Sequence, residues 1–171
     1  MKHFKLLEDD TISVAGHILY RIEATRDFGD VKCGDLGGYV ESLDNLDEEA
    51  WVYGNSKVYG NARVSGKARV SGNAEVSGNA RVSGKARVSG NAEVLGDKIE
   101  KTNDVINISS NVASYNITIT PLHIKIGCHY HSKTAWFNFT YKEIRIMYGE
   151  KSVKWWKTWK PILKSICEGM K

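Results

Sequence analysis

Small and aliphatic residues recur every six positions through the middle of the chain. The aliphatic positions between residues 52 and 95 are all valine, at 52, 58, 64, 70, 76, 82, 88 and 94. An alanine or serine precedes each valine by two positions, and a glycine follows each by two. Alternation over two residues is typical of a β-strand, and glycine accepts the positive φ of a tight corner. Each six therefore predicts a short strand and a corner, with the valine and the small residue pointing inward.

The same spacing excludes two other repetitive structures. An α-helix would lose about 1 kcal/mol at each of these glycines. Collagen needs a glycine at every third residue, whereas here glycine returns at every sixth. The repeat is therefore interpreted as a β structure.

A longer repeat of eighteen residues lies inside the shorter one. Residues 61–78 and 79–96 are identical except that Ser77 is replaced by Leu95. Three sixes make one turn with three sides, which predicts a triangular β-helix whose coils stack through parallel strand pairs. Because Val40 and Leu46 keep the same register, the β-helix is expected to run from about residue 38 to 96, in about three coils.

Stacking at this period places charged residues in columns on the outside. One side carries Lys57, Glu75 and Glu93, in which Lys57 beside Glu75 is a favourable pair, and one corner carries Lys67 and Lys85. Stacked arginines repel each other and are expected to have an acidic or aromatic neighbour. These columns are interpreted either as a solvated charged face or as an interface between identical subunits. The candidate interface residues are Arg63, Arg69, Arg81 and Arg87.

The repeats resemble those of hexapeptide-repeat proteins with a left-handed β-helix, a class that includes many acyltransferases. Residues 19–42, followed by Asn45-Leu46 and Trp51-Val52, also resemble the segment that leads into the repeats of such proteins in phage and prophage genomes. The resemblance covers roughly residues 1–96 and implies a left-handed coil and a trimer. The glycine lies one place later than in the usual family pattern, which weakens an acyltransferase assignment.

The segments on either side of the repeats are expected to form two further regions. Residues 1–36 are interpreted as a β cap, with strands at 2–7, 11–15 and 18–24 and a turn at residues 8–10. The glycines of residues 34–38 lack the pattern of a phosphate-binding loop and are interpreted as a bend into the first coil. The fold class is thus mostly β: this cap, a β-helix at 37–98, and a small α+β domain at 99–171.

The C-terminal region combines a small sheet with helices. Residues 98–104 are interpreted as a polar connector, and three alternating segments between 105 and 127 as antiparallel strands. Residues 138–148 and 151–168 are expected to be helical, with Pro161 bending or dividing the second helix. That helix has one apolar and one basic face. The apolar face holds Trp156, Trp159, Leu163 and Ile166, and the basic face holds Lys154, Lys157, Lys160 and Lys164.

The positive charge is concentrated in this C-terminal region. The chain has a net charge of +4, and residues 101–171 hold eleven Lys or Arg against four Asp or Glu. An anionic partner is therefore expected there. Residues 1–10 lack the apolar core of a signal peptide, no segment is long enough to span a membrane, and the three cysteines are widely spaced. A cytoplasmic location, with no membrane partner, is expected.

Neither catalytic nor metal-binding chemistry is predicted. Cys128, His129 and His131, with His123 nearby, form the one metal-like cluster, but a single Cys-x-x-His pair falls short of a zinc site. The repeats contain no histidine that could serve as a general base, because none lies between His17 and His123. We expect no catalytic residues, no cofactor and no metal.

The leading hypothesis is a non-enzymatic, trimeric binding protein encoded by a phage or prophage. Its basic C-terminal domain would bind a host macromolecule, such as a protein of a defence system. The candidate partner-binding residues are Trp155, Lys154, Lys157, Lys160, Lys164 and Arg145. Trp155 lies off the main apolar stripe and is the best candidate for an exposed contact. One alternative is an acyltransferase or small-ligand site between subunits, which would need His17 or a C-terminal histidine beside the β-helix. Another is nucleic-acid binding by residues 101–171, in which tryptophans stack on bases.

Overall fold

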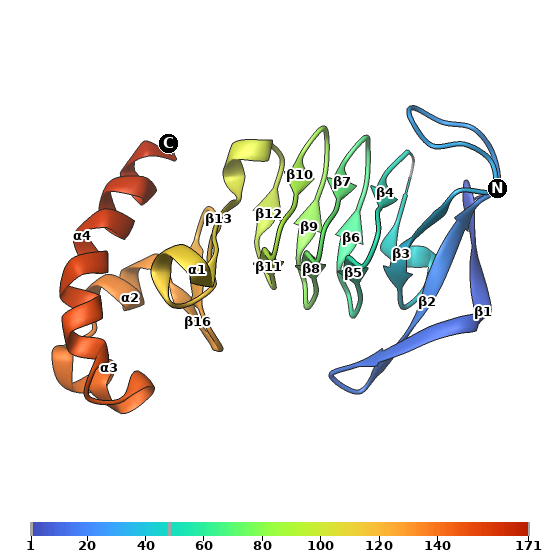
Figure 1. Cartoon of the computed structure of the whole chain (residues 1–171). Coiled ribbons are helices and arrows are strands. Elements are labelled where there is room, and N and C mark those ends of the chain that lie inside the picture. Colours follow the sequence, from blue (N-terminus) through green and yellow to red (C-terminus); the bar gives the residue numbers. More distant parts are fainter. Residues whose placement is uncertain (1, 48, 171) are drawn as a thin grey trace.

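The protein is a rod with three parts, described for residues 2–47 and 49–170 in a computed structural model. Figure 1 shows a β-solenoid in the middle, an antiparallel hairpin at the N-terminal end, and a sheet covered by helices at the other end. The fold is mostly β, and its α-helices gather in the C-terminal region. None of the helices in these residues is both long and apolar enough to cross a membrane.

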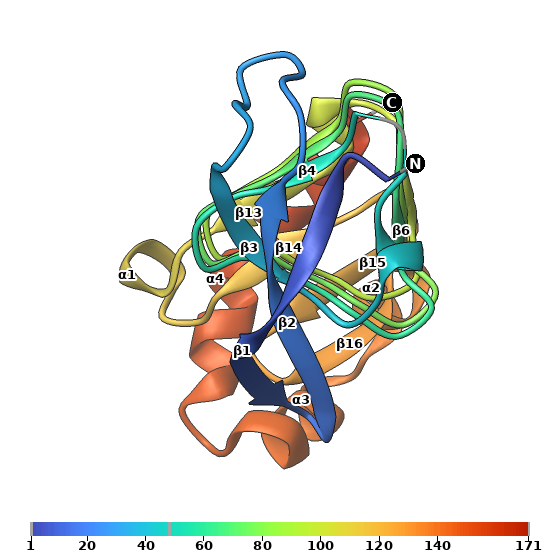
Figure 2. The same cartoon turned by 90° about the vertical axis from the view of Figure 1, so that its right-hand side faces the viewer.

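The solenoid has three turns and three sides, each side being a parallel sheet. The strands of the first side are β3 (Leu36–Val40), β5 (Lys57–Val58), β8 (Glu75–Val76) and β11 (Glu93–Val94). Those of the second side are β6 (Arg63–Val64), β9 (Arg81–Val82) and β12 (Lys98–Ile99). Those of the third side are β4 (Trp51–Val52), β7 (Arg69–Val70) and β10 (Arg87–Val88). In the end-on view of Figure 2 the coils lie over one another.

The core of the solenoid is the predicted column of valines and alanines. Val64, Val82 and Ala80 are each 0% exposed. Val58 lies opposite Val76, and Val76 opposite Val94, which confirms a turn of eighteen residues for these coils. Each buried valine contributes about 1.5 kcal/mol or more, and main-chain hydrogen bonds between coils satisfy the backbone polar groups.

The last turn differs from the prediction because it is one residue shorter. Val82 lies opposite Ile99, which is seventeen residues further along the chain. Residues 98–104 are therefore not only a connector, since β12 continues the second side and Ile99 is buried in the core. The N–H of Arg81 donates to the carbonyl of Asp97, just as that of Arg63 donates to Ala80. Asp97 thus occupies the inward position that alanine fills in the coil before.

The N-terminal hairpin extends the first side of the solenoid. Its strands are β1 (Phe4–Val14) and β2 (His17–Ala24), and β2 pairs antiparallel with β3. The expected turn at residues 8–10 is wrong, because β1 continues and these residues form a bulge. Asp10 at the bulge accepts hydrogen bonds from Arg21 Nε at 2.6 Å and from the Tyr39 hydroxyl at 3.2 Å, which hold the extra residues in place.

Glycines in β3 let the hairpin approach the first coil. A Cβ on Gly37 would lie 2.5 Å from Ile22 Cγ1, and one on Gly38 would lie 2.5 Å from the Ser56 carbonyl oxygen. The bend predicted at residues 34–38 is therefore also a site of close backbone packing. A short 3₁₀ helix, η1 (Leu43–Asn45), then leads to Leu46, which pairs parallel with Val64 on the second side.

The C-terminal region closes the far end of the solenoid. Its antiparallel sheet contains β13 (Ile106–Ile108), β14 (Ile117–Ile119), β15 (His123–Ile126) and β16 (His129–Ser132). The helices are η2 (Thr102–Asp104), α1 (Ser110–Ala113), α2 (Lys133–Asn138), α3 (Tyr141–Tyr148) and α4 (Ser152–Gly169). The sheet contacts the last coil, where Thr118 Oγ1 accepts from the N–H of Glu93 at 3.0 Å and Asn116 Nδ2 donates to the carbonyl of Asn91 at 2.7 Å.

Three predictions about this region need correction. A fourth strand, β16, follows the three expected ones. The expected helix at 138–148 begins only at Tyr141, because Thr140 caps α3 by accepting from the N–H of Glu143 while the Glu143 carboxylate accepts from the N–H of Thr140, and an unpredicted helix, α2, precedes it. Helix α4 runs through Pro161 without being divided. Trp156 and Leu163 on either side of that proline are both buried in the core, which holds the helix together despite the missing N–H.

Candidate functional site

The outer face of α4 carries the lysines that were predicted to bind a partner. Lys154, Lys157 and Lys164 are exposed, and Lys160 is half-buried with its Nζ 5.8 Å from the Trp156 ring centre. The Nζ of Lys157 lies 5.2 Å from the ring centre of Tyr141. Among the described residues, none of these lysines forms an ion pair. The helix lies at the end of the rod opposite the hairpin (Figure 1).

Trp155 is not the exposed contact that the sequence suggested. It is half-buried, its Nε1 donates to the carbonyl of Ala113, and its ring meets that of Tyr115 edge-on at 4.8 Å. Trp156 is fully buried, and the rings of Trp155 and Trp159 stack at 6.0 Å. The tryptophans thus pack between α4 and the sheet, and the basic face offers charge without an exposed tryptophan platform.

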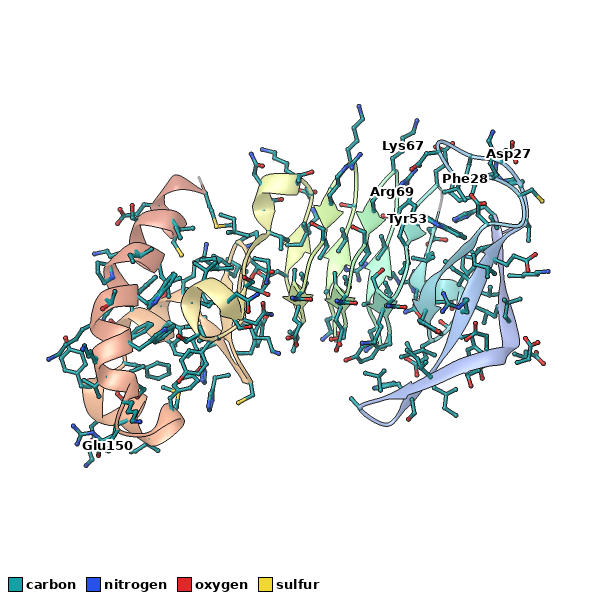
Figure 3. The ribbon with its side chains drawn as sticks, viewed as in Figure 1. Asp27, Phe28, Tyr53, Lys67, Arg69 and Glu150 are labelled. Carbon is teal, nitrogen blue, oxygen red and sulfur yellow. The ribbon has the colours of Figure 1, made fainter. Side chains whose placement is uncertain are left out.

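Arg145 differs from the lysines because it has an acidic neighbour. Its Nε lies 3.2 Å from a carboxylate oxygen of Glu150, and both side chains are largely exposed. Figure 3 places Glu150 at the lower end of the helical region. A surface pair of this kind contributes about 0–1 kcal/mol, so it leaves Arg145 free to exchange partners.

The four arginines of the candidate subunit interface lie on two sides of the solenoid. Arg63 and Arg81 are opposite each other on the second side, and Arg69 and Arg87 on the third. Lys67 lies at the corner between these sides, where its Nζ is 3.6 Å from a Glu49 carboxylate oxygen. An interface that used all four arginines would therefore have to wrap around this corner.

Arg69 has the acidic neighbour that its column was expected to need. Its guanidinium lies 3.2 Å from Asp30 Oδ1 and donates to the carbonyl of Glu49 at 2.7 Å. The Tyr53 hydroxyl donates to Asp30 Oδ2 at 2.8 Å, and this hydrogen bond together with Arg69 lowers the pKa of Asp30. Figure 3 shows Tyr53 and Arg69 beneath the loop that carries Asp27 and Phe28. Arg69 thus attaches this N-terminal loop to the third side.

The charged side chains on the first side of the solenoid form ion pairs. Lys57 Nζ lies 3.9 Å from Glu75 Oε2, as predicted, and Lys125 of the C-terminal sheet pairs with Glu93. Burial raises the pKa of Tyr59 to about 12, and the hydrogen bond that its hydroxyl donates to Glu75 adds to the effect. These contacts leave little unpaired charge on this side.

Two histidines lie beside the solenoid, as the acyltransferase alternative required. His17 Nδ1 is 2.9 Å from a Glu41 carboxylate oxygen, and this hydrogen bond lowers the pKa of Glu41. His123 Nδ1 is 2.8 Å from Asp97 Oδ2, and its ring stacks on Tyr130 at 4.6 Å. A carboxylate at Nδ1 fixes the orientation of an imidazole, as in acid–base sites. Each imidazole is therefore held in one orientation by a carboxylate.

Asp97 was missed by sequence reasoning, although it is the most connected carboxylate of the junction. Its side chain is 0% exposed. Besides His123 it accepts from Thr120 Oγ1 at 2.7 Å, from the N–H of Leu122 at 3.0 Å and from the Tyr130 hydroxyl at 3.3 Å. Burial and the nearby Asp97 raise the pKa of Tyr130. The sequence offered one signal for this buried carboxylate: Asp97 lies one residue before position 98, where the six-residue repeat would place its next small inward-facing residue.

The residues of the metal-like cluster lie on strands β15 and β16 and on the turn between them. His129 and His131 share one face of β16, with ring centres 6.3 Å apart, while Cys128 is exposed at the turn. His123 lies against Asp97 instead. Burial and the neighbouring His129 lower the pKa of His131. Within residues 2–47 and 49–170, no three His, Cys, Asp or Glu side chains converge as metal ligands.

The comparisons with known proteins concern the repeats. A family model, the YdcK beta solenoid repeat, matches three overlapping stretches of the chain, residues 56–72, 68–84 and 74–90. Comparison with curated proteins gives no match. The matched stretches fall within the three-turn solenoid, between the corner before β5 and the corner after β10. Residues 56–90 therefore carry a β-solenoid repeat similar to that of YdcK.

Proposed function

We propose that the protein is a non-enzymatic binding protein whose basic α4 face contacts an acidic surface of a partner protein. The observation that carries this proposal is the row of exposed lysines on the outermost helix. The helix contains four lysines and one glutamate, and no described carboxylate pairs with those lysines. Unpaired surface charge of one sign speeds association with a surface of the other sign.

The solenoid supports this role as a rigid spacer. Its coils share main-chain hydrogen bonds, and the C-terminal sheet is attached to the last coil through the buried carboxylate of Asp97. Helix α4 therefore keeps one orientation relative to the rod. If the chain forms a trimer, as the resemblance to hexapeptide-repeat proteins suggests, three copies of α4 face a multivalent partner and bind it with avidity.

The resemblance also supports an origin and a place of action. The segment before the repeats is similar to that of phage and prophage proteins, and a phage-encoded binding protein of this kind would meet its partner in the cytoplasm of the bacterial host. We therefore place the partner among host macromolecules, with a component of a defence system as the first choice. This step rests on analogy with a fold family.

A charge-reversal experiment on the full chain tests the proposal. In the test variant Lys154, Lys157 and Lys164 are changed to glutamate. In the control variant Arg26, Lys85 and Lys101, which are also exposed, are changed in the same way. We expect capture of a bacterial protein by the wild type and by the control, and its loss from the test variant. Equal capture by the test variant would exclude α4 as the contact.

The same experiment separates a protein partner from nucleic acid. Nuclease treatment of the lysate leaves a protein partner in place and removes a nucleic-acid one. Binding to phosphates would also fall steeply with salt, in proportion to the number of contacts. The half-buried tryptophans favour the protein, because base stacking requires exposed aromatic faces.

A second candidate function is favoured by the pair formed by His123 and Asp97. Its geometry suits a general base for transfer of an acyl group or for a related reaction on a small ligand, because Asp97 orients the imidazole. A higher melting temperature in acetyl-CoA, lost in His123→Gln, would support it. No shift at millimolar acetyl-CoA would exclude this reaction class for the most common acyl donor.

A further inference from the structure

Arg63 and Arg81 form a like-charge pair that the rest of the fold does not neutralise. They lie directly opposite each other on β6 and β9, and adjacent strands are about 4.8 Å apart. Like charges in this position are destabilising. Within the described residues neither arginine forms an ion pair with a carboxylate, whereas Lys57, Lys67 and Arg69 on the same coils each do. An anion between the two guanidinium groups would remove this repulsion.

Both arginines line a cavity of about 410 Å³ at the corner between the first and second sides. Its wall is held by Asn45, which is buried and donates to the carbonyls of Gly60 at 3.2 Å and Ala62 at 2.9 Å. The backbone around the cavity is therefore fixed before any ligand arrives. A volume of this size is in the usual range for small-molecule sites, which is about 300–1,000 Å³.

The remaining lining is polar and includes acceptors as well as donors. Asn61 Nδ2 donates to Asn79 Oδ1 at 3.3 Å, which leaves the Asn61 oxygen and the Asn79 Nδ2 available. The Asp44 carboxylate also lines the cavity, but it lies outside ion-pair distance of either arginine. The cavity lining includes no aromatic ring. A fitting ligand thus combines an anionic group with hydroxyl groups and has no need of an apolar part.

We propose that this cavity binds a small phosphate ester that carries hydroxyl groups. The phosphate lies between the guanidinium groups of Arg63 and Arg81, each of which can donate two parallel hydrogen bonds to it. Hydroxyl groups of the ligand donate to the Asp44 carboxylate and to the Asn61 oxygen, and accept from Asn79 Nδ2. This site is separate from the α4 face, and its failure would leave the proposed partner contact untouched.

Calorimetric titration of the full chain with ribose 5-phosphate tests the site, with ribose and inorganic phosphate as comparison ligands. The test variant is Arg63→Gln with Arg81→Gln, and the control is Lys85→Gln with Lys101→Gln, which removes the same charge outside the cavity and outside the arginine columns. Loss of each charge-assisted contact weakens binding by about tenfold. We expect the test variant to bind ribose 5-phosphate about 100-fold more weakly than wild type, and the control to bind as wild type does.

Several results would overturn the proposal. Absence of binding at millimolar ribose 5-phosphate, or an equal loss in the control, would exclude the cavity as a specific site. If inorganic phosphate binds as tightly as ribose 5-phosphate, the proposed contacts of ligand hydroxyl groups with Asp44, Asn61 and Asn79 are wrong. If the test variant keeps its affinity but sediments as a smaller particle, the two arginines serve a subunit interface and the ligand site is withdrawn.

Discussion

Gly78 lies at the tightest corner of the solenoid, and replacing it with alanine should destabilise the protein more than the same change at Gly54. Both glycines have positive φ, 61° and 59°. A Cβ on Gly54 would meet only the Gly72 carbonyl oxygen, at 3.9 Å. A Cβ on Gly78 would lie 2.3 Å from the Leu95 carbonyl oxygen. The short last turn brings Leu95, rather than a glycine, next to this corner.

The expected magnitudes follow from these two environments. Alanine in the left-handed region costs about 1–2 kcal/mol, which is the whole effect expected at Gly54. At Gly78 the Leu95 carbonyl must also move by about 1 Å, since van der Waals contact requires more than 3 Å. Overpacking costs about 1–3 kcal/mol. The hydrogen bond from the N–H of Asn79 to Leu95, 3.1 Å long, weakens as well. The sum for Gly78→Ala is about 3–5 kcal/mol.

Urea unfolding of both variants measures this difference. Tryptophan fluorescence reports on both ends of the rod, because Trp51 lies in the first coil and Trp156 in the C-terminal core. Equal m-values are required for the comparison of free energies. We expect Gly78→Ala to be less stable than Gly54→Ala by about 2 kcal/mol or more. A difference below about 0.5 kcal/mol would refute the close approach of Leu95 to this corner.

Three further predictions concern other parts of the rod. Val70→Ala, in the middle of the core, should lower the free energy of unfolding by about 2 kcal/mol in urea, and a loss below about 0.5 kcal/mol would contradict the packing. Asp97→Ala removes the carboxylate that accepts four hydrogen bonds, so it should lower the free energy of unfolding by about 3 kcal/mol in the same assay. Unchanged stability would show that alanine, which fills this position in the preceding coil, serves equally well here. Burial lowers the pKa of His3, so the unfolded chain binds a proton that the folded chain does not, and stability should fall as the pH drops below the ordinary value of 6.5. In His3→Gln the urea midpoint should change less between pH 7 and pH 5, and an unchanged slope would assign the pH dependence to other groups.

The solenoid could be predicted because its information is local and repeated. Each valine, alanine and glycine has the same environment in every coil, so one six-residue unit fixes the others. The burial of Val64 and Val82 and the pair of Lys57 with Glu75 follow from this register alone. The register also predicted the columns of stacked arginines. It could not predict the acidic partner of Arg69, because Asp30 lies on a loop 39 residues earlier in the chain.

The features that sequence reasoning missed depend on partners far along the chain. Trp155 is half-buried because Ala113 and Tyr115 lie against it, and they precede it by about forty residues. Asp97 is tolerated inside the solenoid because a later sheet supplies its donors. The cavity beside Arg63 exists because η1 folds over the next corner. None of these contacts leaves a periodic trace in the sequence.

The near-identity of residues 61–78 and 79–96 gives the rod an adjustable length. Removing or duplicating one eighteen-residue block would join each coil to the same neighbours as before, so both ends would keep their own contacts. The distance between the hairpin and α4 would change by one strand spacing, about 4.8 Å, at each step. A gene for such a chain can thus tune the reach of its product by recombination between repeats, without redesigning either terminus.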